Sequence, residues 1–319
     1  MDKKKKIWLT VGIVLTLLGA IIFACVTVAA KGDYTKLSMG KYVSKEYEIE
    51  ENYENISIVT DTADVVFAAA ENGETKVVCV EEENAKHTVN VVENTLVIEL
   101  QNERKWYENW FNFKSPKITV YMPQTARLAL KVQTSSGDVT IPKDFQFESM
   151  EVLGNTGDVV CEASAFGEIN IQRSTGDIRL SNISAKALTI ASSTGDVEIS
   201  NATFEESVDI TVTTGDVSLQ NVACKKLISN GDTGEVELTN VIATEKFLIK
   251  RSTGDVTLKK CDGLEITIET DTGDVTGSLL SAKTFDVKTD TGDVKIPADG
   301  NGGVCKITTD TGDIKIVVE

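Results

Sequence analysis

Residue types that carry enzymatic or metal chemistry are scarce in this 319-residue chain. It contains one histidine, and its six cysteines show no Cys-x-x-Cys spacing. A zinc motif is therefore not expected, and the cysteines do not suggest a disulfide framework. With a single histidine, no Ser/His/Asp or Cys/His set can be assembled, which argues against nucleophilic catalysis. Few prolines and aromatics leave a chain rich in valine, isoleucine, threonine and serine, as is typical of β-strands.

The histidine and the cysteines are expected to play structural parts. His87 precedes the repeat described below, and we expect it to be an exposed strand or loop residue. Cys161 and Cys305 fall at inward positions of the repeat, and Cys79 lies within a strand candidate. Because a free cysteine packs as a small apolar side chain, burial suits all three.

Positive charge is also scarce. The chain has 32 Lys and Arg against 49 Asp and Glu, for a net charge of −17. Residues 1–6 carry four lysines and one aspartate, or +3, and residues 7–30 are uncharged, so the remainder carries −20. An acidic body of that size is repelled by phosphates, which excludes nucleic acid as a natural partner.

The N-terminal sequence predicts a membrane anchor. Residues 7–30 (IWLTVGIVLTLLGAIIFACVTVAA) form a mostly apolar run of 24 residues, long enough to span a bilayer as a helix. The preceding lysines favour a cytoplasmic N-terminus, which places the acidic body outside the cytoplasm of a single-pass protein. Two alternatives remain open. A signal peptide could end at Ala29-Ala30, and the stretch Ile22 to Cys25 resembles a weak lipobox.

A short turn motif, in which threonine or serine precedes a glycine and an acidic residue follows it, occurs ten times. The spacing between successive glycines is always 19 or 20 residues. Such regularity identifies a repeat architecture. The glycines are Gly137, Gly157, Gly176, Gly195, Gly215, Gly234, Gly254, Gly273, Gly292 and Gly312.

The flanks of each turn predict a parallel β-solenoid. Two residues after every glycine stands valine or isoleucine, and apolar residues alternate with polar ones on both sides. This period of two is typical of half-buried strands. Separate hairpins would leave the fixed period unexplained, whereas coils stacked at ~4.8 Å require it. Ten coils would form an all-β rod of roughly 48 Å, right-handed by default.

The corner residues have a physical explanation in such a stack. Glycine tolerates positive φ, and aspartate can accept hydrogen bonds from nearby backbone amides. A second row lies six residues after the glycines, where stacked amides can hydrogen-bond along the axis. Its members are Asn182, Asn201, Asn221 and Asn240.

Residues 31–131 follow the repeat only weakly. ENISIVTDTADVVFAA, residues 54–69, resembles one degenerate coil with Ala63 in place of glycine. Later strand candidates predict an antiparallel region that caps the open end of the stack. We therefore divide the chain into a cytoplasmic tail (1–6), a transmembrane helix (7–30), a β cap (31–131) and a β-solenoid (132–319).

The anchor, the irregular β cap, SPKITVYMPQTARLALKVQTSSGDVTIPKDF (residues 115–145) and the iterated STGDV and DTGDV turns resemble the bacterial DUF4097 family. The similarity covers about Tyr47 to Glu319. The resemblance implies an adhesin-like cell-envelope protein with a β-solenoid, and a link to envelope stress. It implies no catalytic residues.

The acidic residues at the corners could bind a cation or could accept hydrogen bonds from the backbone. In the last coils a second acidic position joins the first, and oxygen ligands at that spacing could hold Ca²⁺. The alternative is that each aspartate accepts backbone hydrogen bonds and faces water. No other cofactor is expected. The cation candidates are Asp271, Asp274, Asp290, Asp293, Asp310 and Asp313.

The sequence disfavours two classes of enzyme, the aspartic proteases and the polysaccharide hydrolases or lyases. Asp-Thr-Gly occurs four times, but an aspartic protease needs two such loops facing each other across a cleft. A polysaccharide hydrolase or lyase needs carboxylates in contrasting environments, usually within long loops that these regular coils lack. We therefore expect no enzymatic activity.

The segment KWYENWFNF, residues 105–113, is the recognition candidate. Its five aromatic side chains could bind glycan, a partner protein or the membrane interface, or could fold over the first coil as a cover. They are Trp106, Tyr107, Trp110, Phe111 and Phe113. The sequence thus predicts a membrane-anchored adhesin or envelope-binding module. The alternative is an accessory protein of an envelope stress response that acts through membrane partners.

Overall fold

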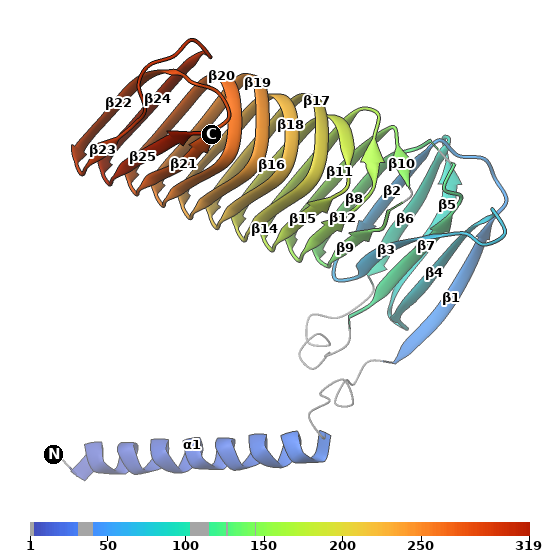
Figure 1. Cartoon of the computed structure of the whole chain (residues 1–319). Helices are drawn as coiled ribbons and strands as arrows, with labels where there is room; N and C mark the ends of the chain where they lie inside the picture. Colours follow the sequence, from blue (N-terminus) through green and yellow to red (C-terminus); the bar gives the residue numbers. More distant parts are fainter. Residues whose placement is uncertain (1–2, 31–40, 103–114, 126, 144) are drawn as a thin grey trace.

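The computed structural model describes residues 3–30, 41–102, 115–125, 127–143 and 145–319 (Figure 1). Helix α1 (Lys3–Ala30) is long and apolar enough to cross a membrane, and its side chains from 5 to 29 are almost all exposed. Strands make up nearly all of the rest, and 23 of them join in one continuous sheet. The all-β prediction is therefore confirmed.

The repeat winds into a parallel β-solenoid, as predicted, with about nine turns where the sequence suggests ten coils. Each strand pairs in parallel with its equivalent one repeat away, so that Ile199 faces Leu219 and Leu219 faces Leu238. Figure 1 shows these turns as a row of superposed ribbons. The strands are β8 (Ala129–Ser136), β9 (Val139–Ile141), β11 (Ser149–Thr156), β12 (Val159–Cys161), β14 (Glu168–Thr175), β15 (Ile178–Ser181), β16 (Ser184–Thr194), β17 (Val197–Thr214), β18 (Val217–Thr233), β19 (Val236–Thr253), β20 (Val256–Thr272), β21 (Val275–Leu279), β22 (Thr284–Thr291), β23 (Val294–Lys295), β24 (Val304–Thr311) and β25 (Ile314–Val318), with the short pair β10 (Gln146–Phe147) and β13 (Ser164–Ala165).

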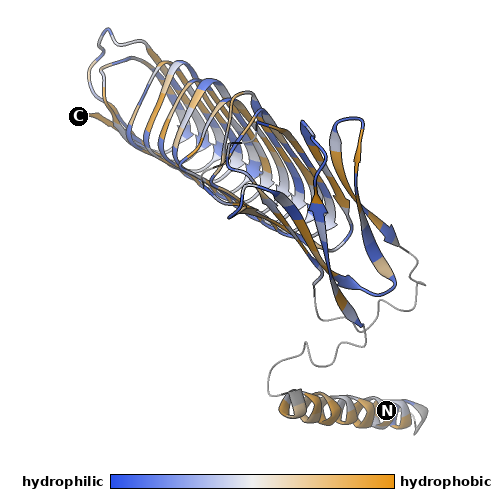
Figure 2. Cartoon of the chain, turned by 90° about the vertical axis from the view of Figure 1, so that its right-hand side faces the viewer, coloured by the Kyte–Doolittle hydropathy of each residue, from blue (hydrophilic) through white to orange (hydrophobic). Residues whose placement is uncertain are grey.

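One apolar interior runs through the whole stack. The residue two positions after the corner glycine is buried in every turn except the outermost, where Val294 is 46% exposed. Polar and apolar residues alternate along the strands, as Figure 2 shows. Cys161 and Cys305 lie in this interior at 2% and 0% exposure, so their predicted inward positions are confirmed. Burial of these rows, at about 25 cal/mol per Å², supplies the main drive for stacking.

The region before the repeat caps one end of the stack. Strands β2 (Asn55–Thr60) and β3 (Asp64–Ala69) pair in parallel with β8 and β9, so residues 54–69 form the predicted degenerate coil. On their other side they pair with β6 (Thr95–Asn102) and β7 (Lys117–Met122). Antiparallel pairings then add β1 (Tyr42–Ile49), β4 (Thr75–Glu82) and β5 (Ala85–Val92), as the antiparallel prediction requires.

The last two coils do not stack in chain order, contrary to the simple winding that the sequence predicts. Strand β20 pairs with β24, and β24 pairs with β22 on its other side. Gly312 therefore stacks on Gly273, and Gly292 forms the outermost corner. Figure 1 shows β22 at the end of the stack. Strand β24 buries Cys305 and Ile307 completely, so the more apolar strand occupies the enclosed level.

Candidate functional site

The corners form a continuous hydrogen-bonded row along one edge of the solenoid. The backbone amides of eight corner acids donate to the Oδ1 atom of the corner aspartate in the adjacent turn, at 2.7 to 3.0 Å. Gly195 has a φ of 129°, and a Cβ there would lie 2.2 Å from the carbonyl oxygen of Gly176. These bonds offset the repulsion between like charges, because most of the corner carboxylates accept an amide hydrogen. The row thus has a structural role.

The six cation candidates lie along this edge. Asp274 and Asp313 each accept a neighbouring amide through Oδ1, and Lys315 contacts Oδ2 of Asp313 at 2.6 Å. The backbone hydrogen bond from Asp293, helped by Lys315, lowers the pKa of Asp313. Lys288 forms an ion pair with Asp290 at 2.7 Å. Amides and lysines therefore already use part of this ligand capacity, and Ca²⁺ binding here stays a prediction. Asp271 and Asp310 are exposed, two residues before their corners.

The asparagine row forms the predicted ladder. Asn201, Asn221 and Asn240 donate through Nδ2 to Oδ1 of the asparagine in the preceding turn, at 3.3, 2.8 and 2.9 Å. All four asparagines have φ between 52° and 56°. Asparagine tolerates this left-handed conformation better than most residues, so the ladder and the backbone favour the same residue.

The predicted aromatic recognition segment lies outside the described residues. Trp106, Tyr107, Trp110, Phe111 and Phe113 all fall within residues 103–114. Their recognition role therefore stays a prediction.

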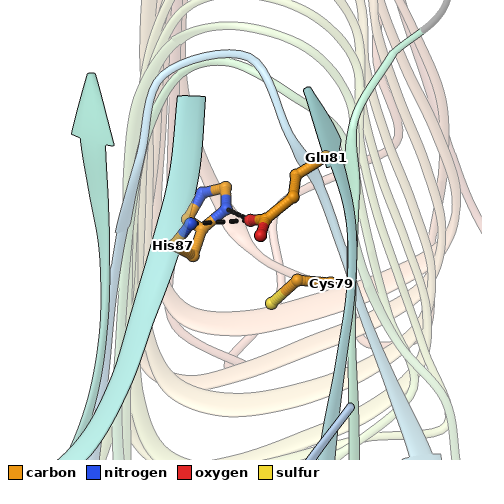
Figure 3. Close-up of side chains that lie close together, drawn as sticks. All are labelled: Cys79, Glu81 and His87. Carbon is orange, nitrogen blue, oxygen red and sulfur yellow. Dashed lines mark hydrogen bonds and ion pairs between the residues drawn. The ribbon is translucent and has the colours of Figure 1, made fainter. Parts of the chain in front are cut away.

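A different cluster of chemical groups lies inside the cap. Cys79 and Glu81 belong to the inward-facing row of β4, and His87 belongs to that of β5. All three are buried, at 0%, 0% and 3% exposure. Figure 3 shows their side chains pointing toward one another between the two strands. We call these residues the cap centre.

Hydrogen bonds fix most atoms of the cap centre. Oε2 of Glu81 accepts the backbone amide of His87 at 2.6 Å and lies 2.8 Å from Nδ1 of the same residue. The other ring nitrogen, Nε2, lies 2.9 Å from Oγ1 of Thr60, at the end of β2. The hydroxyl of Tyr47 donates to the carbonyl of His87 at 2.8 Å. The ring and the carboxylate are therefore held in one orientation.

Two atoms of the cap centre are unusual. Oε1 of Glu81 is buried and has no hydrogen-bond partner among the described residues. Burial, with the charge of Glu81 adding to it, raises the pKa of the Cys79 thiol to about 12. Each of Cys79, Glu81 and His87 offers one ligand atom, and these three atoms lie within 4.8 Å of one another. Sulfur, oxygen and nitrogen donors thus converge on one point.

The sequence alone did not predict this cluster, and the prediction for His87 was wrong in part. His87 does lie on a strand, but it is buried. The useful signal was the period of two in HTVNVV, which places His87 on the same face as Val89 and Val91. The same alternation places Glu81 on the face of Val77 and Cys79. A polar residue in an inward row is rare and informative.

A shallow groove of about 620 Å³ crosses the solenoid from β2 to β17. Among the described residues its lining carries hydroxyl and amide groups, apolar side chains and Arg173, but no carboxylate, although the chain has a net charge of −17. The lining side chains that carry polar groups are Thr60, Gln133, Thr134, Ser135, Asn155, Gln172, Arg173, Ser174, Ser192, Ser193, Thr211 and Thr213.

Arg173 lies beneath this groove. It is 4% exposed, and its Nε and Nη1 atoms have no hydrogen-bond partner among the described residues. Burial lowers its pKa, although Asp138 and Asp158 act in the opposite direction. Gly154 makes room for it, because a Cβ there would lie 1.9 Å from Nη1. The groove therefore has a buried cation at its base.

The chain is similar to several solved bacterial structures at low identity. A candidate adhesin from Bacteroides fragilis is 16% identical, over 87% of this chain and 97% of that one, with a TM-score of 0.41. A candidate adhesin from Parabacteroides distasonis is 12% identical, over 88% of this chain and 98% of that one, with a TM-score of 0.49. A candidate lipid-binding protein from the same species is 18% identical, over 87% of this chain and 98% of that one, with a TM-score of 0.44. No curated protein matches the chain.

The sequence matches one protein family across both the cap and the stack. The matched segments are residues 53–228 and 205–319, which include every corner glycine of the repeat. The chain therefore belongs to the DUF4097, or Toastrack, family.

Proposed function

We propose that this protein is a membrane-anchored binding module of the adhesin type, which holds an envelope ligand outside the cytoplasm. The observation that carries the proposal is the groove from β2 to β17, which lacks carboxylates on an otherwise acidic protein. Parallel stacking keeps its hydroxyl and amide groups in rows about 4.8 Å apart. Rows of that kind suit a polar repeating ligand, such as an envelope glycan.

The anchor in this proposal is α1. The segment Lys5–Ala29 is apolar, and none of it is buried against the rest of the chain. Four lysines at its N-terminal end favour a cytoplasmic tail by the positive-inside rule. This orientation would leave the solenoid on the outer side, where an envelope ligand is accessible.

We propose a binding role and not a catalytic one. The Asp-Thr-Gly aspartates Asp271, Asp310 and Asp290 follow one another along a single edge, because their turns stack in that order. An aspartic protease instead needs two carboxylates that share a proton across a cleft. A glycosidase likewise needs an acid and a base on opposite sides of its substrate.

The test is a glycan-array and envelope-extract binding assay with the full-length chain in detergent. Replacing Gln133 and Gln172 by alanine removes two long amide side chains from the groove, and we expect binding to weaken at least tenfold. Gln220→Ala removes an exposed glutamine outside the groove and should leave binding unchanged. Equal binding by all three proteins, or no binding by any, would contradict the proposal.

Two further arms of the assay address the other predictions. Loss of binding in Trp106→Ala and Trp110→Ala, with the glutamine variants unaffected, would assign recognition to the aromatic segment. Loss on adding EDTA would support cation binding at the acidic corners. Capture of membrane proteins that disappears when residues 7–30 are exchanged for an unrelated transmembrane helix would favour the accessory stress-response role.

A further inference from the structure

We propose that the cap centre is a binding site for a divalent transition-metal ion of the Zn²⁺ or Co²⁺ class. The ligands would be Sγ of Cys79, Oε1 of Glu81 and Nδ1 of His87. This inference is independent of the groove and of the adhesin role.

The positions of the three donor atoms support the site. One ligand atom from each residue lies within 4.8 Å of the other two, and Figure 3 shows the side chains converging. Tetrahedral zinc with bonds of about 2.0–2.3 Å places its ligands about 3.3–3.8 Å apart. The donors would therefore move closer by about 1.5 Å or less, which side-chain rotation can supply.

The orphaned oxygen of Glu81 is the strongest indication. Oε1 is fully buried and has no partner among the described residues, while Oε2 is held by the backbone amide of His87. A buried carboxylate oxygen without a hydrogen-bond partner destabilises the fold, because it has lost its water and gained nothing in exchange. A metal ion would satisfy Oε1 and leave the bond between Oε2 and the amide intact. One oxygen would thus ligate while the other orients the carboxylate.

The charges of the ligands select the class of ion. A thiolate and a carboxylate together carry −2, and the imidazole is neutral when it ligates, so a divalent ion makes the buried site neutral. Calcium and magnesium prefer oxygen ligands alone, whereas thiolate and imidazole donors favour zinc-like metals. Binding would deprotonate the Cys79 thiol, because the thiolate is the form that ligates a metal.

The surroundings provide the outer shell that such a site requires. A ligating histidine almost always donates its second N–H to a neighbouring acceptor. With Nδ1 on the metal, Nε2 would donate to Oγ1 of Thr60, which already lies 2.9 Å away. The hydroxyl of Tyr47 holds the backbone carbonyl of His87. These contacts orient the imidazole before any ion arrives.

The other buried cysteines lack this arrangement. The thiols of Cys161 and Cys261 donate to backbone carbonyls. Cys224 lies in the interior of the stack, and among the described residues no such His, Cys, Asp or Glu group gathers around it. It therefore provides a matched control.

The test is Co²⁺ and Zn²⁺ binding to the full-length chain in detergent. Because the cap centre is buried, the metal is supplied both to the folded protein over a long incubation and during refolding. We expect one ion per chain by elemental analysis and a thiolate-to-cobalt charge-transfer absorption band. Cys79→Ala should abolish that band, and Cys224→Ala should leave it unchanged.

Two more variants separate a metal site from a buried ion pair. Glu81→Gln and His87→Gln should each weaken Co²⁺ binding at least 100-fold. Thr60→Val keeps the side-chain shape, and loss of the outer-shell contact should weaken binding about tenfold. Absence of a thiolate band in the wild-type protein under both loading conditions would overturn the proposal. So would a band of equal strength in Cys79→Ala. Because the wild-type spectrum alone can refute the site, the test does not depend on every variant folding.

Discussion

At the scale of single residues, the rows along the solenoid show which side chain each position requires. The asparagine row ends at Lys260, which occupies the next equivalent position with a φ of 55°. Its amide donates to Oγ of Ser278, and its side chain forms a long, exposed ion pair with Glu319 at 3.9 Å. Lysine gains nothing from the ladder at this position and carries the strain of a left-handed conformation.

We therefore predict that Lys260→Asn stabilises the protein by about 0.5–1.5 kcal/mol, the net value of one hydrogen bond. The new amide would donate to Oδ1 of Asn240 and extend the ladder by one turn, while the strain of positive φ would fall. Chemical denaturation of the two proteins measures the difference. Lys259→Asn, on the neighbouring residue without positive φ, serves as the control and should not stabilise. A lower midpoint for Lys260→Asn would contradict this account.

The corner row shows that aspartate and glutamate are not equivalent at this position. Glu235 is its only glutamate, and among the described corners its carboxylate accepts no amide from the following turn, whereas Oδ1 of Asp216 does. The aspartate side chain has the length that reaches the neighbouring amide, and one more methylene group moves the oxygens past it. Charge alone therefore does not explain the preference for aspartate.

At the scale of elements, the irregular end of the stack depends on Lys283. This lysine is 1% exposed, and its ammonium group donates to the carbonyls of Gly263 and Gly302 at 2.7 and 2.6 Å. It also contacts Ser281 at 2.8 Å and Asp262 at 2.5 Å. The contacts join β20 to the two segments that flank the outermost coil. Lys283 thus fixes the crossing that places β24 inside β22.

We predict that Lys283→Met destabilises this end of the protein by about 3–5 kcal/mol, as for other buried ion pairs that lose one partner. Hydrogen exchange should become faster in β22 to β25 and stay unchanged in β14 to β18. The control is Lys288→Met, whose exposed pair with Asp290 should contribute little to stability. Uniform loss of protection along the whole stack would contradict this local role.

Acid should reproduce the effect of Lys283→Met. Burial opposes ionisation of Asp262, but hydrogen bonds from Lys283, Ser281 and Gly263 outweigh it and lower the pKa of Asp262. A carboxyl group with a lowered folded-state pKa stabilises the fold above its ordinary pKa, and that contribution is lost as the pH falls through the lowered value. Protection in β22 to β25 should therefore fall only at strongly acidic pH.

The same elements show how far the sequence could predict the structure. The glycine spacing and the alternating residues were enough to predict parallel coils, the corner bonds, the asparagine ladder and the degenerate coil at residues 54–69. The exchange of β22 and β24 could not be predicted, because spacings of 19 and 20 residues are equally compatible with either stacking order. The cap centre was missed for another reason. Its residues come from strands with different partners, and only the folded cap, in which β6 pairs with both β2 and β5, brings Thr60, Glu81 and His87 together.

At the scale of the whole molecule, the protein is a stack with two different ends. The cap closes one end with antiparallel strands. The other end exposes Val294 and Ile296 at 46% and 36%. Its edge strand β22 presents Asp286, Lys288 and Asp290 to solvent, and such charges discourage pairing with another chain. In a stack each turn contacts only its neighbours, so stability should be nearly additive along the axis.

The two ends should therefore respond differently to deletion. A chain that ends at Leu279 loses β22 to β25 but keeps every pairing from the cap to β21. We predict that it still folds, with a proportionate loss of strand signal in far-ultraviolet circular dichroism and a cooperative thermal transition. Deletion of residues 41–128 removes the cap together with the degenerate coil, and exposes the apolar interior beneath β8 and β9. That chain should aggregate, because no antiparallel cover replaces what was removed, whereas the chain that ends at Leu279 keeps the exposed Lys259, Lys260 and Glu265 on its outer strand β20. If the chain that ends at Leu279 were the one that fails to fold, the outermost coils would be the nucleus of the structure, and stability would not be additive along the stack.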